Sequence, residues 1–353
     1  MRSLLLFQNY LNSESTIKQY TWYLKKFLEF YHLKDYDSLT KIDPSKLQTM
    51  IEDYIMDLKK RYSPNSLPTY FYPLQTFFEA NDIELKWKKI KRLLPKKVKL
   101  SGDEAYTTQD IKKMLSFALT SRNKSLIHFL ASTGVRVGAI PELRLKHLTE
   151  MPMGCKSVFV YDDSTEEYFT FLTPEASLSL DDYFKERQKD GERLNSESPV
   201  FRVKYQIGIQ KVEAITIQGI QGVISRCAEQ GGLRDKKKGA RFSKQLDHSF
   251  RKRFNTILKL NKEVNPNIIE KMMGHKKGLD GVYLKPTKEE MFEEFKKGMA
   301  DLTIDDSERV KAENVKLLQE KSELEKANEK LQNSMRKVDE LWADKQRMEN
   351  KKN

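Results

Sequence analysis

The sequence predicts a mainly α-helical protein with one small antiparallel β-hairpin, and three observations support this fold class. Apolar residues recur at helical spacing through most of the chain. Two runs of β-branched and aromatic residues, at 157–161 and 168–172, flank a polar turn, as in a hairpin. Aliphatic residues seven positions apart predict a coiled-coil-like helix near the C-terminal end. The 353 residues suffice for two cores and an appendage.

The first predicted domain, residues 1–95, is all helical. Its apolar spacing fits four helices, and cap signals such as Asp43-Pro44-Ser45 separate them. Eight basic residues then lie between Lys86 and Lys99, and we expect a basic linker over residues 96–106. This run is either a solvated spacer or a strap on a nucleic-acid backbone, and the positive charge of the whole chain favours the strap.

The second predicted domain, residues 107–304, is mainly helical around the hairpin. Helices are expected at 108–119, 121–131, 174–187, 214–229 and 248–259. A further helix follows Thr287, and its apolar stripe consists of Met291, Phe292, Phe295, Met299 and Leu302. That stripe packs either on its own domain or on a neighbouring subunit.

The last segment, residues 305–353, carries the heptad stripe. The residues seven apart are Val310, Leu317, Leu324, Leu331 and Val338. If these are d positions, the a positions are Asn314, Lys321, Asn328, Met335 and Trp342, and polar a residues weaken a coiled coil while fixing its register. We expect self-association through a weak parallel coiled coil. The alternative is a single amphipathic helix folded back on the body.

Composition limits the classes of function. A net charge of +13 and a pI near 9.3 favour a polyanionic partner, which leaves DNA, RNA and anionic membrane. The sequence has no apolar run of eighteen residues and no signal-peptide pattern, so we expect a soluble cytoplasmic protein with no membrane partner. Cys155 and Cys227 predict reduced thiols, and the five histidines show no metal-ligand spacing. We expect no metal and no cofactor.

Four short stretches contain residues that suit the transfer of a phosphodiester. Arg136 follows Thr133-Gly134-Val135, and a guanidinium matches two phosphate oxygens. His248 and Arg251 lie three apart, on one face of a predicted helix. His275 follows a glycine at a helix end, and Tyr283 follows His275 by eight residues. Each stretch alone has an ordinary structural explanation, such as a helix cap or a packed aromatic residue.

In their joint order, these motifs resemble the tyrosine recombinase (phage integrase) family, which shows Arg, His-x-x-Arg, Gly-His and then Tyr. The stretches HSFRKRFNTIL, MMGH and YLKPT look most like integrases of archaeal proviruses and mobile elements. The resemblance spans roughly residues 4–304. It implies a helical core-binding domain followed by a catalytic domain, and an enzyme that integrates or excises DNA at double-stranded attachment sites as a homotetramer, at the nucleoid.

The resemblance also implies roles for the five candidate catalytic residues. Tyr283 would attack the phosphate and form a 3′-phosphotyrosyl bond, releasing a 5′-hydroxyl. Arg136 and Arg251 would bind the non-bridging oxygens, where charge develops in the transition state. His248 would accept the proton of the tyrosine, and His275 would hydrogen-bond the phosphate. The covalent ester stores the phosphodiester bond, so that rejoining needs no ATP.

The sequence departs from the family at three places. Family members usually carry a lysine in the hairpin as general acid, but the turn 162–167 has none, and Lys156 and Lys204 are the substitutes considered. Ala139 stands where many relatives have Glu, and Tyr283 lies one residue closer to His275 than is usual. The alternative hypotheses are therefore a non-catalytic DNA-binding protein with the same fold, or a type IB topoisomerase. Tyr161 and Tyr168 are the alternative nucleophiles.

Overall fold

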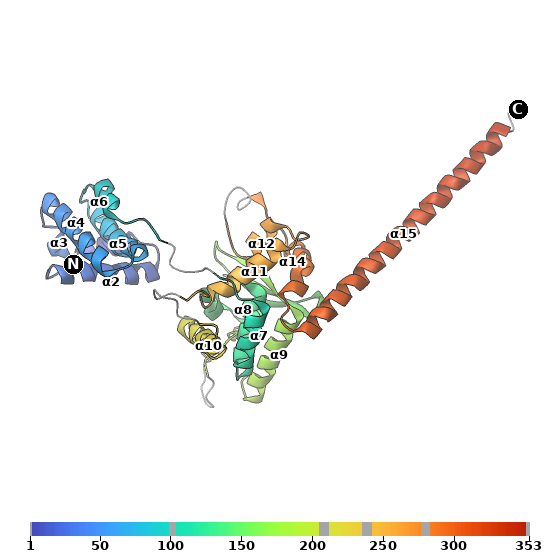
Figure 1. Ribbon diagram of the computed structural model, residues 1–353, viewed down its shortest axis with the longest axis horizontal. Helices are drawn as coiled ribbons and strands as arrows, with labels where there is room; N and C mark the ends of the chain where they lie inside the picture. Colours follow the sequence, from blue (N-terminus) through green and yellow to red (C-terminus); the bar gives the residue numbers. More distant parts are fainter. Residues whose placement is uncertain (1, 99–103, 205–211, 235–241, 277–282, 351–353) are drawn as a thin grey trace. The chain divides into compact units, whose positions relative to one another are not determined.

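The computed structural model describes residues 2–98, 104–204, 212–234, 242–276 and 283–350. The chain divides into two compact units, Met1–Leu100 and Ser101–Asn353, each with its own core. Helices dominate both units, and one three-stranded antiparallel sheet lies in the second (Figure 1). The predicted fold class is confirmed.

The first unit is built from helices around an aromatic core. They are α1 (Arg2–Asn9), α2 (Glu14–Phe30), α3 (Tyr36–Leu39), α4 (Pro44–Arg61), α5 (Leu67–Ala80) and α6 (Trp87–Leu93). The side chain of Asp43 accepts from backbone N–H groups and caps α4, as predicted, and Ser13 caps α2 in the same way. The fully buried residues include Phe27, Phe71 and Phe77.

Two short helices of this unit were not among the four predicted. The helix α3 is one turn long, and α6 lies inside the basic run between Lys86 and Lys99, just before the expected linker at 96–106. The reason for α6 is Ile90, which is fully buried in the core of the unit, while Lys88, Lys91 and Arg92 on the same helix are exposed. A charged segment can thus be helical when one residue per turn anchors it.

The second unit places helices around the sheet. The helices are α7 (Thr108–Ser116), α8 (Ser121–Thr133), α9 (Pro174–Lys189), α10 (Ile217–Gln230), α11 (His248–Leu260), α12 (Pro266–Met272), α14 (Lys288–Leu302) and α15 (Asp306–Asn350). Short 3-10 turns lie at Val137–Glu142, Leu145–His147 and Pro152–Gly154. Most of these helices begin and end within a few residues of the positions that the cap signals and the apolar spacing predicted.

The sheet has the order β1-β2-β3, with β1 (Leu148–Met151), β2 (Cys155–Val160) and β3 (Tyr168–Leu172). The predicted hairpin is confirmed as β2 and β3, with Val158 opposite Thr170. The edge strand β1 was not predicted, because its four residues, LTEM, show no run of β-branched or aromatic residues. Helices α8, α12 and α14 all contact β3, so that the sheet joins the two halves of the core.

The apolar stripe of α14 packs on its own unit. Its residues Met291, Phe292, Phe295, Met299 and Leu302 are all buried, in one cluster with Phe171 of the sheet and Phe254 of α11. Of the two alternatives for this stripe, the structure therefore shows packing within the chain.

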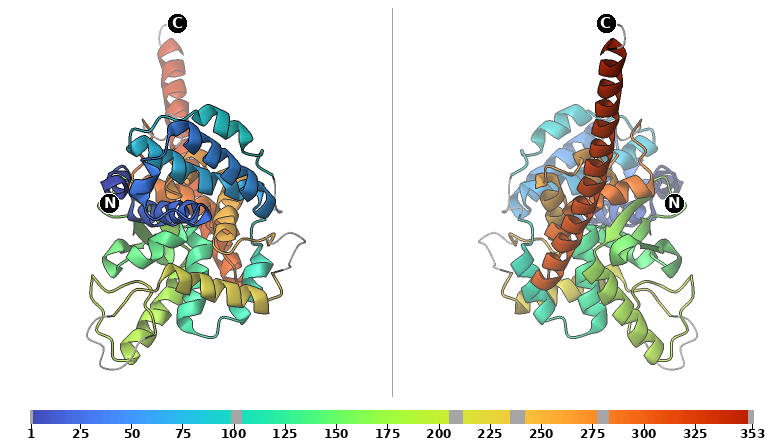
Figure 2. Two further views of the ribbon diagram at one scale, coloured as in Figure 1. Left: turned by 90° about the vertical axis from the view of Figure 1, so that its left-hand side faces the viewer. Right: turned by 90° about the vertical axis from the view of Figure 1, so that its right-hand side faces the viewer.

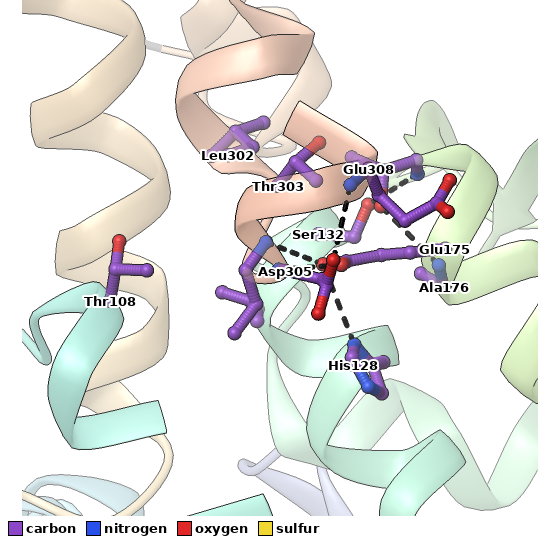
Figure 3. Close-up of polar contacts among 12 residues, drawn as sticks. Thr108, His128, Ser132, Glu175, Ala176, Leu302, Thr303, Asp305 and Glu308 are labelled. Atoms are coloured by element: carbon purple, nitrogen blue, oxygen red, sulfur yellow. Dashed lines mark hydrogen bonds and ion pairs between the residues drawn. The ribbon is translucent and has the colours of Figure 1, made fainter. Parts of the chain in front are cut away.

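The turn between α14 and α15 is held by a buried carboxylate. Glu175, at the start of α9, accepts hydrogen bonds from the backbone N–H groups of Ile304 (2.6 Å) and Asp305 (2.9 Å). Figure 3 shows the Glu175 side chain between Asp305 and His128 of α8, whose Nδ1 lies 3.6 Å from the carboxylate. Lys112 of α7 pairs with Asp306 at 2.6 Å. The first turn of α15 is therefore fixed to α7 and α9.

The helix α15 runs without interruption from Asp306 to Asn350, and the right view of Figure 2 shows it as one continuous ribbon. Its heptad residues Val310, Leu317, Leu324 and Leu331 are 51–64% exposed in the single chain. In the part of the chain that the structure describes, no helix is both long and apolar enough to cross a membrane.

Candidate active site

Arg251 is a buried cation that backbone carbonyls hold in place. It lies in the first turn of α11 and is 8% exposed. Its Nη1 donates to the carbonyl of Gly134 at 2.8 Å, and its Nη2 donates to the carbonyl of Met273. Among the described residues, no carboxylate forms an ion pair with it. The charge of Arg251 is therefore hydrogen-bonded but not neutralised.

Gly134 ends α8 and brings Arg136 to the same place. It adopts a left-handed conformation, with φ of 57°. A Cβ atom here would lie 2.7 Å from Cβ of Phe254, one turn beyond Arg251 on α11. Only glycine allows the two helices to approach this closely. Two residues later, the exposed Arg136 directs Nη2 to the carbonyl of Gly274 at 3.5 Å.

His275 follows α12 and faces Arg251. Its Nε2 lies 2.7 Å from Nη2 of Arg251, and its Nδ1 contacts the carboxylate of Glu270. Because the guanidinium can only donate, we assign the proton of the neutral ring to Nδ1. Burial lowers the pKa of His275. The hydrogen bond that His275 donates to Glu270 opposes this effect, whereas the positive charges of Arg251 and Arg136 add to it. The net shift is downward, which favours the neutral ring.

A second glycine, Gly274, fits this loop against the sheet. Its φ is 63°, and a Cβ atom here would lie 2.5 Å from the ring of Tyr168, the first residue of β3. Burial raises the pKa of Tyr168, and the nearby charges of Arg251 and Arg136 only partly offset that rise. Tyr168 is thus a packed residue beneath the loop, and its burial disfavours it as a nucleophile.

The two arginines also influence each other. Burial lowers the pKa of Arg251, Tyr168 opposes this shift, and the charge of Arg136 adds to it. Two guanidinium groups that repel each other, from α11 and from the end of α8, face the same His275 loop. A bound anion would relieve this repulsion, and the fork geometry of guanidinium fits a phosphate.

The structure brings three of the five predicted site residues together and leaves two apart. Arg136, Arg251 and His275 share one network. His248, the exposed first residue of α11, and Tyr283, which is 79% exposed, form no hydrogen bond with that network among the described residues. Residues 277–282, which connect the His275 loop to Tyr283, lie outside the described part of the chain.

Other residues of the site were missed by the sequence analysis. Glu270 orients His275 and itself contacts Lys259, but no motif marks a glutamate five residues before a histidine. Lys276, directly after His275, lies with Nζ 3.5 Å from Oε1 of Glu166, in the turn between β2 and β3. Its position directly after the motif histidine was the only feature of the sequence that could have pointed to Lys276 as a residue of the site.

Lys156, one of the two substitutes for the hairpin lysine, is held elsewhere. It is 6% exposed and pairs with Glu150 and with Asp181 (3.1 Å). Burial alone would lower its pKa, but the two carboxylates outweigh burial and raise it. It lies near the start of β2, four residues before the strand ends, or about 13 Å from the turn. Lys204 is exposed.

No group of three or more His, Cys, Asp or Glu side chains is placed to hold a metal ion in the described residues. Cys155 and Cys227 are both buried and free, and burial raises the pKa of each thiol.

Comparison with known proteins gives one family. The model of the phage integrase family matches residues 104–280, half of the chain. Tyrosine recombinase XerA of the archaeon Pyrococcus horikoshii is 28% identical over 134 residues, which are 38% of this chain and 42% of that protein. The chain thus matches less than half the length of this relative.

Two solved structures share the fold. The XerH site-specific recombinase bound to difH substrate has a TM-score of 0.55 and 19% identity, over 74% of each chain. Lambda integrase bound to DNA has a TM-score of 0.54 and 14% identity, over 80% of this chain and 94% of that one. Together with the matched family model, these findings confirm the predicted resemblance: the chain belongs to the phage integrase family.

Proposed function

We propose that the protein is a site-specific DNA recombinase, an integrase that cleaves and rejoins DNA through a 3′-phosphotyrosyl intermediate to integrate or excise a mobile element. The observation that carries this proposal is Arg251, a buried guanidinium without a carboxylate partner among the described residues, beside Arg136 and a neutral His275. Such a site suits a phosphate whose negative charge increases during reaction.

The proposed reaction is a transesterification. The phenolic oxygen of Tyr283 attacks the phosphorus, and the bond from phosphorus to the 5′-oxygen breaks. Arg136 and Arg251 stabilise the charge on the non-bridging oxygens. His275 donates to a phosphate oxygen once the phosphate replaces Arg251 beside Nε2 and the ring carries a proton on that nitrogen. His248 accepts the tyrosine proton. Tyr283 is 79% exposed, so it is accessible to a DNA strand. The reverse attack by a 5′-hydroxyl rejoins the strand.

The basic surface of the first unit supports DNA as the substrate. Exposed aromatic rings there lie beside cations: Lys26 is 5.2 Å from the ring of Trp22, and Lys91 is 5.9 Å from that of Tyr72. Cations bind phosphates, and aromatic rings pack against sugars and bases. We propose that this unit binds attachment-site duplex, which would place the protein at the nucleoid.

A covalent-trapping experiment tests the proposal. The full-length chain is incubated with a random-sequence duplex pool, and covalently captured duplexes are recovered after denaturation and sequenced. A nicked suicide duplex of the recovered sequence should then give a protein–DNA band on a denaturing gel. Tyr283→Phe should abolish the band. Arg251→Ala and Arg136→Ala should each slow its formation by about 10²-fold or more.

Two alternative functions remain distinguishable by this design. A non-catalytic DNA-binding protein would bind duplex but form no band with the unchanged chain; the turn between β2 and β3, which carries no lysine, is the observation that favours it. A type IB topoisomerase would form the band but would not exchange strands between two labelled sites. A band that survives Tyr283→Phe would move the nucleophile to Tyr161 or Tyr168.

We further propose that the protein acts as a homotetramer on DNA. Lambda integrase has been solved as a dimer bound to a core site and as a tetramer bound to a Holliday junction, with TM-scores of 0.52 to this chain. Strand exchange joins two duplexes, each cut at two places, so four active sites are needed. Crosslinking of the full chain on two labelled sites should yield a tetramer.

Off DNA, we propose that α15 pairs with α15 of a second copy as a parallel coiled coil. Residues 305–353 hold twelve Lys or Arg and twelve Asp or Glu, so that this segment has no net charge to attract DNA. A parallel alignment places Asn314 against Asn314 and Asn328 against Asn328 of the partner, whereas an antiparallel one would face these amides with aliphatic d residues. Lys321, a third polar layer, lies 3.9 Å from Glu325 of its own helix.

Disulfide trapping tests the coiled coil and its direction. Leu317→Cys should give a disulfide-linked dimer, because d residues of a parallel pair lie within bridging distance. Asn333→Cys, on the opposite face of α15, is the matched control and should stay monomeric. Cys155 and Cys227 are buried and will not interfere. A Leu317→Cys chain that remains monomeric after oxidation would contradict the parallel pairing.

A further inference from the structure

The proposed reaction leaves one proton without a donor, and this inference rests on that proposed function. The departing 5′-oxygen must take up a proton. Arg136 and Arg251 do not release theirs, because a guanidinium stays protonated in proteins. The Nδ1 proton of His275 is held by Glu270, and its Nε2 faces Arg251. His248 receives the proton of Tyr283, and it forms no hydrogen bond with the Arg251 network among the described residues. We therefore look for the donor among the remaining side chains of the site.

We propose that Lys276 donates this proton. It follows His275 directly, and consecutive Cα atoms lie about 3.8 Å apart, so its backbone adjoins the network of Arg251. Its Nζ reaches Oε1 of Glu166 in the turn between β2 and β3, at 3.5 Å. The turn between β2 and β3 contains no lysine, but Lys276, in the loop after α12, places its ammonium group beside this turn.

The turn itself lies beside the two arginines. The charge of Glu166 acts on the half-buried Tyr161, and the charges of Arg136 and Arg251 act on the same ring. Burial is the main cause that raises the pKa of Tyr161, and these three charges modify it. Glu166, the partner of Lys276, and the arginines therefore surround one side chain. An ammonium at this turn is near a phosphate that both arginines bind.

The contact of Lys276 with Glu166 can be exchanged for DNA. Both side chains are about half exposed, at 46% and 59%. An ion pair in such a position is weak, because solvent and salt screen it. A DNA backbone at the site would compete with Glu166 for the ammonium. Glu166 thus positions Lys276 before DNA binds and does not hold it afterwards.

The proposed step balances without a co-reactant. The bond from the Tyr283 oxygen to phosphorus forms as the bond from phosphorus to the 5′-oxygen breaks. A proton moves from Nζ of Lys276 to that oxygen, which leaves a 5′-hydroxyl and a neutral amine. In the rejoining step, the amine takes the proton back from the attacking 5′-hydroxyl.

A modified DNA substrate can distinguish proton donation by Lys276 from any other role of this residue. The suicide duplex recovered by covalent trapping is made in two forms, with oxygen or with sulfur at the 5′-bridging position of the cut. A thiolate leaves without a proton. Lys276→Ala should form the covalent band at least about 10²-fold more slowly than the unchanged chain on the oxygen duplex. On the sulfur duplex, the two rates should agree within a few fold.

Three variants serve as controls. Lys276→Arg keeps the charge but cannot release a proton, so it should be slow on oxygen and restored on sulfur. Arg251→Lys should be slow on both duplexes. Lys185→Ala removes another exposed lysine, which pairs with Asp182 on α9, and it should change neither rate.

Two results would overturn the assignment: a rate of Lys276→Ala on the oxygen duplex equal to that of the unchanged chain, or an equal loss on both duplexes. A different result marks the failure of the proposed function: if the unchanged chain forms no covalent band with either duplex, neither the recombinase reaction nor its proton donor stands.

Discussion

Arg251 is stabilised by geometry at the ends of two helices. Helix ends leave carbonyl groups without helical partners, and the carbonyls of Gly134 and Met273, at the ends of α8 and α12, accept from its guanidinium. This arrangement satisfies the donors without cancelling the charge. The residue can therefore stay buried and still attract a phosphate. The conformation of Gly134 is the condition for this geometry.

Replacement of Gly134 by Ala should destabilise the protein by about 2 kcal/mol or more. The left-handed φ of 57° costs an alanine about 1–2 kcal/mol, and the new Cβ would lie 2.7 Å from Phe254, which adds overpacking of about 1–3 kcal/mol. Gly222→Ala is the matched control: this exposed position in α10 has no atom within 4 Å of the added Cβ, and it should gain about 0.5–1 kcal/mol. Urea unfolding of both variants measures the difference, and equal midpoints would contradict it.

The pKa of His275 should fall further when Glu270 becomes Gln. The folded-state pKa is already below 6.5 because burial and the two arginines outweigh Glu270, and Gln removes the single opposing charge. Histidine-detected NMR titration of the two proteins measures the shift, and His275→Gln identifies the signal. An unchanged or higher pKa in Glu270→Gln would contradict the assigned contact.

The same shift fixes the sign of a pH effect on stability. The unfolded chain binds the His275 proton first, at its ordinary pKa of about 6.5, because the folded value is lower. The contribution of His275 is therefore fully present above pH 6.5 and is lost as the pH falls through the folded value. His275→Gln should reduce the loss of stability in this window, and urea midpoints at pH 7.5 and below 6 measure it.

The sequence predicted part of the site, and the reason is chemical. The order and spacing of the motifs singled out Arg136, Arg251 and His275, because few side chains other than guanidinium and imidazole suit a reacting phosphate. The structure shows these three residues together. The contact of Glu270 with His275 and the packing of Tyr168 beneath the loop could not be predicted. Their contacts depend on Gly274, whose left-handed turn folds the loop onto β3, and glycine alone does not specify such a turn.

At the level of elements, cap signals were reliable where side chains bond to backbone N–H groups. Thr107 and Thr287 each form a capping box, and the helices begin at the next residue as expected. The strand β1 and the helix α6 escaped prediction because tertiary contacts create them: β1 pairs with β2, and Ile90 anchors α6. Local sequence does not encode such contacts.

Glu175→Gln should loosen the junction between α14 and α15 in particular. The carboxylate accepts from two backbone N–H groups, and hydrogen bonds to a charged group contribute about 1.5–3 kcal/mol. The amides of Ile304 and Asp305 should therefore exchange hydrogen roughly tenfold faster or more, since 1.4 kcal/mol corresponds to a factor of ten. Glu186→Gln, an exposed position on the same helix α9, should leave both amides unchanged. Equal exchange in the two variants would show that Glu175 does not hold the junction.

On the scale of the whole molecule, charge is unevenly distributed along the chain. The tail 305–353 is neutral, so the entire net charge of +13 lies in residues 1–304. The part with the aromatic and basic surface and the arginine pair is thus the part that we propose to contact DNA. The exposed heptad residues of α15 form an apolar stripe instead, which is the surface that we propose to pair with a second copy.

Because the tail is neutral and the rest of the chain is basic, we predict that variants of the tail can abolish dimer formation without changing the contacts with DNA phosphates. The double variant Leu317→Asp and Leu324→Asp should abolish dimers in analytical ultracentrifugation, because it places charge at two buried layers of the proposed coiled coil. Its affinity for a short half-site duplex should fall with salt along the same slope as that of the unchanged chain, because the slope counts phosphates neutralised by basic residues, and the tail supplies no net charge.

Asn333→Asp, which adds a charge on the opposite face of α15, controls for charge alone and should leave both the dimer and the slope unchanged. On a duplex with two half-sites, the double variant should bind more weakly than this control, since a dimer gains effective concentration at the second site. A shallower salt slope in the double variant would mean that α15 contacts DNA, and the neutral tail would then have to be assigned to the DNA interface.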